Sequence, residues 1–175
     1  LPPARVKELC DNGRSLLDMF AASTWPSVVV IDGVCVGGGL ELALACDLRI
    51  ATENPKTILG MPEVKLGLLP GWGGTVRLPR LIGTGPAIEL IASGDAITGS
   101  QAKTLGLVDA CVPVHSARES ACALIEQTIA TADYCKRRAE LQLPQVLDKP
   151  ESDFLLATTG AAIVSRTKGN YPAPM

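Results

Sequence analysis

Two glutamates lie in segments where acidic side chains are uncommon, and both have the chemistry to move protons. Glu41 follows a glycine triplet, Gly37–Gly39, in an otherwise apolar run of strong helix formers. Glu63 follows Pro62 in a stretch of apolar and glycine residues. Two carboxyl groups that converge on a pocket with little water are suited to general acid/base catalysis. The sequence spacing leaves open whether these two side chains converge.

Each glutamate also has a simpler interpretation. Glu41 is placed where a negative charge stabilises the N-terminus of a helix, on a face that reaches solvent. Glu63 is then an exposed loop charge that pairs with Lys65. Both interpretations stay open at this point.

The glycine triplet itself lies between a predicted strand and a predicted helix. Glycine permits positive φ angles and a close approach to the backbone, and the first N–H groups of a helix have no partner within it. Such a turn can bind an anion or a developing oxyanion, although it can equally be a tight turn needed only for packing. Neither Gly37–Gly39 nor the second cluster, Gly71–Gly74, completes the G-x-G-x-x-G pattern of dinucleotide-binding proteins.

The composition excludes several classes of protein. The 175 residues include 47% hydrophobic and 19% charged residues, which is enough for a buried core. A net charge of -2 and only 3% aromatic residues argue against a nucleic-acid-binding protein. The longest uncharged stretch, Met19–Ile31, has 13 residues and contains Pro26, so we expect no membrane span.

The cysteines and the single histidine do not form a metal-binding pattern. No two of the six cysteines have C-x-x-C spacing, and His115 is the only histidine. We therefore predict no metal site and interpret the cysteines as thiols of a reduced, cytoplasmic protein. No signal peptide is visible in the sequence.

Strand and helix signals alternate along the first part of the chain and helices dominate later, which predicts the α/β class. Ser100 is the expected N-cap of one helix, Pro79 is expected to interrupt another, and the last helix should end near Gly169. Residues 60–74 are expected to form a loop. The predicted strands cover residues 28–31, 48–51, 57–59 and 107–112, and the predicted helices cover residues 3–21, 40–45, 75–82, 86–93, 100–105, 117–142 and 153–167.

Two longer motifs resemble the enoyl-CoA hydratase/isomerase (crotonase) family. They are Ile31–Ala43, read as I-D-G-V-C-V-G-G-G-L-E-L-A, and Gly60–Thr75, read as G-M-P-E-V-K-L-G-L-L-P-G-W-G-G-T. A shorter match is Gly106–Asp109. The segments Asn54–Thr57 and Asn170–Pro174 are most similar to the hydratase region of bacterial multifunctional fatty-acid oxidation enzymes. The resemblance covers nearly the whole chain.

The resemblance implies a fold and a set of site residues. The fold is a crotonase-like spiral of β-β-α turns, with residues 1–115 as a partial core whose N-terminal part is missing and residues 116–175 as a helical C-terminal region leading toward an absent dehydrogenase domain. Glu41 and Glu63 are the implied catalytic residues. The implied substrate-binding residues of the oxyanion hole and pocket are Gly38, Gly39, Gly71 and Trp72. Simple loop packing is the alternative for Trp72. Lys65 has two interpretations, a contact to a CoA phosphate and a solvated surface charge.

The resemblance also implies an activity, which is the syn addition of water to 2-enoyl-CoA thioesters in fatty-acid β-oxidation. Isomerisation of 3-enoyl-CoA to 2-enoyl-CoA is a further possibility for the same residues. Acyl-CoA is the expected substrate and no cofactor is expected for this chain, because NAD belongs to the dehydrogenase region. Expected partners are further copies of the chain or a thiolase subunit.

Two alternatives to hydratase activity are a non-catalytic fragment and another reaction of the same family. Because the chain starts at Leu1 without a methionine and stops at Met175 in what reads as a continuing segment, we expect a fragment. The family's first oxyanion donor would lie upstream of the Leu1–Val6 region, and the early strands are missing, so the fragment should fold poorly alone or have little activity. It would then be a non-catalytic acyl-CoA-binding or oligomerisation segment. Another chemistry of the family, such as decarboxylation or thioester hydrolysis, is disfavoured because both glutamates are present.

Overall fold

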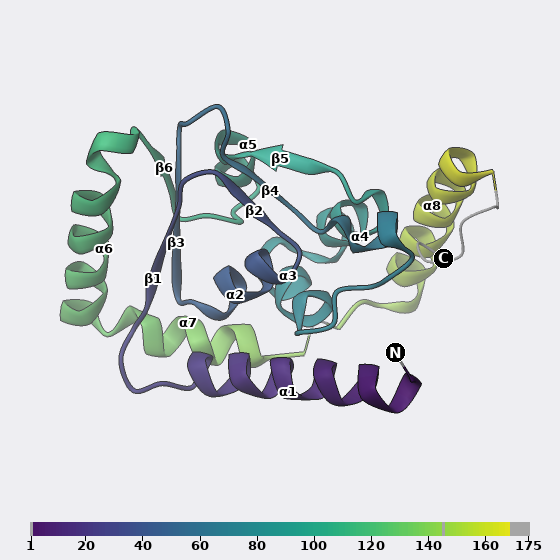
Figure 1. The fold of residues 1–175 in the computed structure, drawn as a ribbon, viewed down its shortest axis with the longest axis horizontal. Helices are drawn as coiled ribbons and strands as arrows, with labels where there is room; N and C mark the ends of the chain where they lie inside the picture. The colour runs from purple at the N-terminus through teal and green to yellow at the C-terminus, as the bar shows by residue number, and fades with distance from the viewer. Residues whose placement is uncertain (1, 145, 169–175) are drawn as a thin grey trace.

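The computed structural model describes residues 2–144 and 146–168, and it shows strands and helices in alternation, followed by three long helices (Figure 1). The α/β prediction is therefore confirmed. The strands are β1 (Val28–Ile31), β2 (Val34–Val36), β3 (Leu48–Thr52), β4 (Ile58–Gly60), β5 (Ala96–Thr98) and β6 (Ala110–Val112). The helices are α1 (Pro3–Ala21), α2 (Gly38–Ala45), α3 (Gly74–Ile82), α4 (Thr84–Ser93), α5 (Gly99–Thr104), α6 (Ala117–Thr131), α7 (Asp133–Gln142) and α8 (Lys149–Thr167), with short 3₁₀ helices η1 (Pro62–Leu66) and η2 (Val114–Ser116).

The strands form two small sheets, and successive β-β-α turns contribute to both. One sheet has the order β1-β3-β6 with parallel pairing, and the other has the order β2-β4-β5, in which β5 is antiparallel to β4. All five residues of β3 are buried, which suits a central parallel strand. Strands β1 and β2 are neighbours in sequence but belong to different sheets. The turn after β2 leads directly into α2.

Helix α2 lies at the centre of the hydrophobic core, which explains its composition. Its sequence, G-G-L-E-L-A-L-A, is apolar on nearly every side, and five of its eight residues are buried. It packs with β2, α1 and α3. The core cluster around it consists of Ile31, Leu40, Ala43, Leu44, Ala51, Leu59, Met61, Leu78, Ala87, Leu90, Ala102, Leu107 and Val108. A glutamate in this helix is therefore placed inside the protein by its neighbours.

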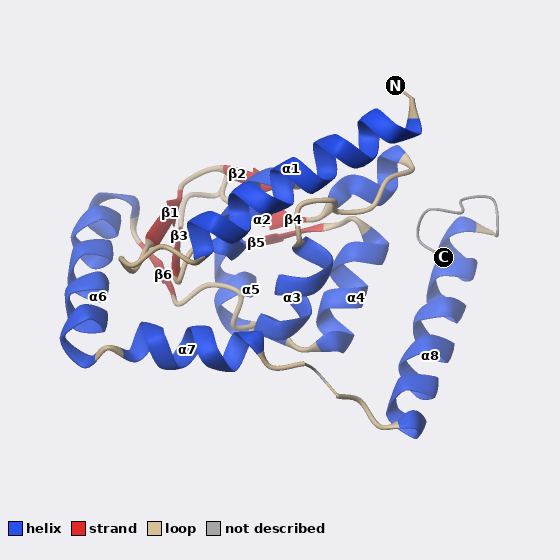
Figure 2. Ribbon diagram, turned by 90° about the horizontal axis from the view of Figure 1, so that it is seen from below, coloured by secondary structure: helices blue, strands red, loops and turns tan. Residues whose placement is uncertain are grey.

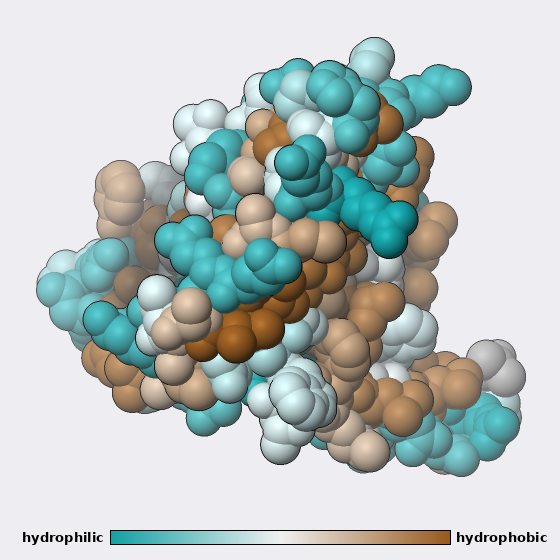
Figure 3. Space-filling view, turned by 90° about the vertical axis from the view of Figure 1, so that its left-hand side faces the viewer, coloured by the Kyte–Doolittle hydropathy of each residue, from teal (hydrophilic) through white to brown (hydrophobic). Residues whose placement is uncertain are grey.

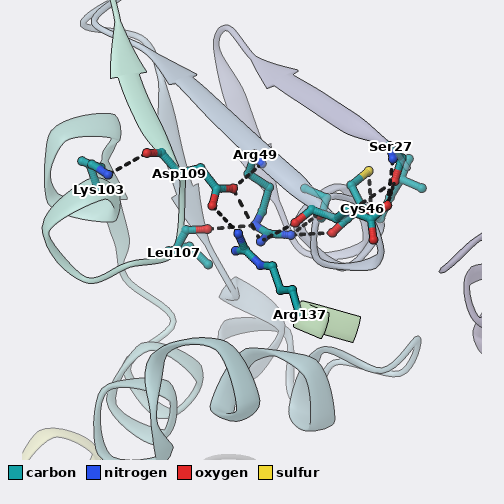
Figure 4. A network of polar contacts seen from close by, with 10 residues as sticks. Ser27, Cys46, Arg49, Lys103, Leu107, Asp109 and Arg137 are labelled. Carbon is teal, nitrogen blue, oxygen red and sulfur yellow. Dashed lines mark hydrogen bonds and ion pairs between the residues drawn. The ribbon is translucent and has the colours of Figure 1, made fainter. Parts of the chain in front are cut away.

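A buried arginine, Arg49 in β3, ties the end of α2 to the sheet (Figure 4). Its side chain is almost fully enclosed and donates hydrogen bonds to the carbonyl oxygens of Leu107 at 2.9 Å, Cys46 at 2.6 Å and Ala43 at 3.2 Å. Burial lowers the pKa of Arg49 to about 10, although the nearby carboxylate of Asp109 acts in the opposite direction. The guanidinium thus links two carbonyl oxygens at the end of α2 to the carbonyl oxygen of Leu107, which lies before β6.

The structure differs from the predicted helices in three places. Residues 117–142 form two helices, because Ala132 has a φ angle of 54° and turns the chain between α6 and α7. Helix α3 continues through Pro79, which lies in its second half and removes only one backbone donor. Helix α8 begins at Lys149, four residues earlier than predicted, with the side chain of Asp148 as its N-cap. The predicted end near Gly169 lies outside the described residues.

The remaining differences concern short elements. The strands β2 and β5 were not predicted, since each has three residues and depends on pairing with β4. Residues 107–109 are not part of a strand, and β6 begins at Ala110. The loop predicted for residues 60–74 contains η1. The N-cap of α5 is Thr98 and not Ser100, because the Thr98 side chain accepts a hydrogen bond from the Gln101 N–H in a capping box.

The long helices surround the two sheets (Figures 1 and 2). Helix α6 packs on β1 and β3, and α8 packs against α4 on the opposite side of the molecule. Figure 3 views the face that carries α6, where hydrophobic side chains gather between hydrophilic ones. A cavity of about 380 Å³ between β1 and α6 is lined by apolar side chains that include Val28, Val30 and Ile125. None of the helices within residues 2–144 and 146–168 is both long and apolar enough to cross a membrane.

Candidate active site

Glu41 is buried and is held by the main chain of a distant loop. Its side chain lies in the first turn of α2 and the residue is only 2% exposed. The carboxylate Oε1 accepts hydrogen bonds from the N–H of Trp72 at 2.7 Å and the N–H of Gly74 at 2.8 Å. The alternative in which Glu41 reaches solvent is therefore wrong. Two fixed donors on one oxygen give this carboxylate a defined orientation.

Glu63 lies in the first turn of η1, and its side chain is only partly shielded from solvent. Its Oε2 atom is buried and has no hydrogen-bond partner among the residues that the structure describes. Burial raises the pKa of Glu63, and the negative charge of Glu41 raises it further. Lys65 pairs with Asp95 at 3.0 Å, so the predicted Glu63–Lys65 pair is wrong.

The glycine turn brings Glu63 next to the start of α2. Gly37 has a φ angle of 56°, and its N–H donates to the carbonyl of Gly60 at 3.0 Å, which fixes the turn to β4. A Cβ atom at Gly37 would lie 3.2 Å from Oε1 of Glu63. Gly38 and Gly39 follow in the first turn of α2, where backbone N–H groups have no acceptor within the helix. A carboxyl group with a raised pKa thus lies beside a set of N–H donors.

Trp72 packs over Gly38 and reaches helix α1. A Cβ atom at Gly38 would lie 2.8 Å from Cζ3 of the indole, and one at Gly13 in α1 would lie 2.2 Å from its Nε1. Both positions therefore require glycine for the ring to occupy this place. Gly71 is next to α1 as well, since a Cβ there would lie 3.0 Å from the sulfur of Cys10.

The structure thus assembles four of the predicted residues in one place and leaves two at its margin. Glu41, Glu63, Gly38 and Trp72 are linked by the contacts described above, through hydrogen bonds, close packing and the effect of one carboxylate on the pKa of the other. Gly71 lies on the α1 side of this group. At Gly39 a Cβ atom would meet nothing within 4 Å, so only its main chain can act in the site.

Three residues of the site were not identified from the sequence. Gly74 donates to Glu41 and would bring a Cβ atom to 2.9 Å from Cε of Met61. Gly13 contacts the Trp72 ring, and Arg77 binds the carbonyl of Trp72 at 2.8 Å. Two of them carry a signal in the sequence. Gly74 lies within the glycine cluster and the second family motif. Gly13 is expected in the middle of a helix, where glycine is unfavourable by ~1 kcal/mol and so indicates a close contact.

The described part of the chain holds no group of three or more histidine, cysteine or acidic side chains arranged to bind a metal ion. The site brings together two carboxyl groups and main-chain N–H donors. Such a set can bind a carbonyl oxygen and transfer protons next to it.

Comparison with known proteins identifies the family. The sequence profile of enoyl-CoA hydratase/isomerase matches residues 4–152. A fatty acid oxidation complex subunit alpha from Vibrio cholerae is 45% identical over 96% of this chain, and one from Shewanella halifaxensis is 39% identical over 97%. The chain spans 24% of the length of each of these two relatives.

Solved structures show the same relationship. An enoyl-CoA hydratase from Bacillus anthracis is 33% identical and has a TM-score of 0.70, with 97% of this chain and 66% of that chain covered. A putative enoyl-CoA hydratase from Thermobifida fusca, solved in complex with acetoacetyl-CoA, is 26% identical with a TM-score of 0.71, and the match covers 93% of this chain and 64% of that one. The chain therefore belongs to the enoyl-CoA hydratase/isomerase family and has its crotonase-like α/β fold.

Proposed function

We propose that the chain supplies the hydratase site of a fatty-acid oxidation protein and adds water to 2-enoyl-CoA thioesters. The observation that carries this proposal is the pairing of two carboxyl groups with different surroundings. Glu41 accepts two main-chain hydrogen bonds, whereas Glu63 has a buried oxygen without a partner among the described residues and a raised pKa. Family membership and relatives named for fatty acid oxidation support the same choice of substrate.

In this proposal the N–H of Gly38 donates to the thioester oxygen. Polarising this carbonyl makes the β-carbon electrophilic and stabilises the enolate that forms, and the loss of such a donor typically raises the barrier by ~3 kcal/mol. The position of Gly38 in the first turn of α2 supports this role, since its N–H has no acceptor within the helix.

Glu41 and Glu63 hold one water molecule between them. The water oxygen forms a bond to the β-carbon while the water proton passes to Glu41, and Glu63 gives its proton to the α-carbon. The raised pKa of Glu63 supports its assignment as the proton donor, because it keeps the acid form available at higher pH. Addition of water transfers no electrons, so this step requires no redox cofactor.

Isomerisation is the second activity that the same pair of carboxyl groups supports. A proton removed from the α-carbon of a 3-enoyl-CoA and returned to the γ-carbon gives the 2-enoyl-CoA, with no water consumed. The experiment is to assay the full-length protein for turnover of crotonyl-CoA and, separately, of a 3-enoyl-CoA. Hydration of the first supports the proposal, and binding of acyl-CoA without turnover of either substrate contradicts it.

A role within a larger assembly is part of the proposal. The curated relatives are named as alpha subunits of a fatty acid oxidation complex, and this supports an association with further copies or with a thiolase subunit. Size-exclusion chromatography of the purified protein with and without a thiolase partner tests this association.

A further inference from the structure

Arg77 in α3 folds back over the loop Gly71–Gly74 that holds Glu41. Its Nη1 atom donates to the carbonyl oxygen of Trp72 at 2.8 Å. The same atom would lie 2.3 Å from a Cβ atom at Gly73, so the guanidinium lies directly over that peptide. Its Nη2 atom is hydrogen-bonded to Asp18 in α1. One guanidinium thus contacts two peptides of the loop and joins them to a separate helix.

The loop is held from its other side by Glu41. The Trp72 N–H and the Gly74 N–H both donate to Oε1 of this glutamate, while the Trp72 carbonyl accepts from Arg77. The N–H and the carbonyl of Trp72 are therefore both engaged, each by a charged side chain. The Arg77 contact and the two contacts with Glu41 thus involve the same short stretch of main chain.

The composition of the loop explains why it requires an external contact. Three of its four residues are glycine, and Gly73 has a φ angle of 108°. A chain of glycines has a large conformational freedom in the absence of fixed partners. The guanidinium has the planar, two-pronged geometry needed to reach a carbonyl and a carboxylate together, which a lysine ammonium does not reproduce.

The Arg77–Asp18 pair is poorly suited to stabilise the fold as a whole. The Asp18 side chain is 63% exposed, whereas that of Arg77 is 16% exposed. Ion pairs with a solvent-exposed partner typically contribute only ~0–1 kcal/mol to stability. The contact is better explained by what it holds in place than by the free energy of the pair itself.

We propose that Arg77 is a positioning residue that keeps the Trp72 and Gly74 amides in the geometry required to orient Glu41, with Asp18 anchoring it to α1. This inference rests on the proposed function, because orienting Glu41 matters to turnover only if Glu41 acts in hydration. The side-chain contacts of Arg77 are with the Trp72 carbonyl and with Asp18, and neither is with Glu41 or Glu63.

The test compares Arg77→Gln with Arg80→Gln in the protein as it is encoded. Arg80 lies one turn further along α3, so the two changes remove the same charge from the same helix. Arg80 is the control because it makes no hydrogen bond or ion pair with the residues that the structure describes. We expect Arg77→Gln to lower kcat for crotonyl-CoA by about 10- to 100-fold with little change in KM, since misplacement of a catalytic group affects turnover first. Arg80→Gln should leave both constants close to those of the wild type.

A second readout follows the loop directly. In a Trp25→Phe background, Trp72 is the only tryptophan, and its quenching by acrylamide reports how exposed the indole is. We expect Arg77→Gln to increase this quenching and Arg80→Gln to leave it unchanged. If Arg77→Gln fails to fold, Asp18→Asn replaces it, because this exposed side chain carries little of the stability, and it should change quenching and kcat in the same direction by a smaller factor.

The outcomes separate this inference from the proposed function. Equal kcat and equal quenching in Arg77→Gln and Arg80→Gln would overturn the positioning role. If the wild-type protein hydrates no enoyl-CoA, the proposed function fails, and the quenching comparison alone decides whether Arg77 holds the loop. A large rise in KM with an unchanged kcat would also contradict the inference, because it would place Arg77 in substrate binding.

Discussion

Gly74 donates its N–H to Glu41 at a position where an added side chain would press on both Glu41 and Met61. The hydrogen bond to Oε1 is 2.8 Å long, and a Cβ atom at this position would lie 3.1 Å from the same oxygen and 2.9 Å from Cε of Met61. Both Glu41 and Gly74 are buried. The start of α3 and the start of α2 thus meet at one carboxylate oxygen.

The first prediction concerns Gly74→Ala. The added methyl group displaces either Glu41 or Met61, and we expect kcat for crotonyl-CoA to fall by about 10- to 100-fold because Glu41 loses its orientation. Steady-state kinetics measures the change. Gly160→Ala in α8 is the matched control, since a Cβ atom there meets nothing within 4 Å. Full activity in Gly74→Ala would show that the orientation of Glu41 is unimportant.

The second prediction concerns the contact between Gly38 and Trp72. Gly38→Ala introduces a Cβ atom 2.8 Å from the indole and should lower kcat/KM, because the ring and the first turn of α2 move apart. In a Trp72→Ala background this clash is absent, so the same change should have a smaller effect. A double-mutant cycle in kcat/KM measures the coupling. Equal losses from Gly38→Ala in both backgrounds would exclude the contact.

The third prediction is a pH dependence of stability. Because the pKa of Glu63 is raised in the folded protein, the folded state retains a proton over a pH range in which the unfolded chain has lost it. The contribution of Glu63 to the free energy of unfolding should therefore fall as pH rises from the ordinary carboxyl pKa, about 4.3, through the raised pKa of Glu63.

Glu63→Gln removes this contribution. Its free energy of unfolding, relative to that of the wild type, should rise with pH across the same range, and urea denaturation at several pH values measures it. Glu126→Gln is the control, because Glu126 is exposed on α6. Parallel pH profiles for the wild type and Glu63→Gln would contradict the burial of this carboxyl group.

The fourth prediction tests the start of α5. Thr98 and Gln101 form a capping box, with the Thr98 N–H donating to Oε1 of Gln101 at 2.9 Å. Thr98→Ala should lower the free energy of unfolding by ~1 kcal/mol, whereas Ser100→Ala should change it by less than ~0.5 kcal/mol. A larger effect at Ser100 than at Thr98 would favour the helix start that the sequence alone suggested.

The helices and buried strands that the sequence predicts correctly are those with long or strongly apolar patterns. Helix α1, strand β1 and helix α2 agree with the expected ranges to within two residues. By contrast, β2 and β5 have three residues each, and they become strands only because β4 pairs with both. Pairing between strands that are distant in sequence cannot be recognised from a local sequence pattern.

The residues of the candidate site also differ in whether a local sequence pattern reveals them. Glu41, Glu63 and Gly38 could be proposed as site residues from the sequence because their motifs are local and resemble those of a known family. Arg77 was missed because its partners, Trp72 and Asp18, belong to a loop and to a helix that is 59 residues away in sequence. An arginine in an amphipathic helix is ordinarily a surface residue, so only the three-dimensional structure shows its contact with the loop.

The most direct test of the account is the hydration of crotonyl-CoA by Glu41→Gln and by Glu63→Gln, each measured beside Glu126→Gln. Glutamine preserves the size of each side chain but cannot exchange a proton. We expect each of the two variants to lose at least ~100-fold in kcat while still binding acyl-CoA in a calorimetric titration, with Glu126→Gln unchanged. Turnover within about threefold of the wild type in either Glu41→Gln or Glu63→Gln would contradict the central claim that these two carboxyl groups act together on one water molecule.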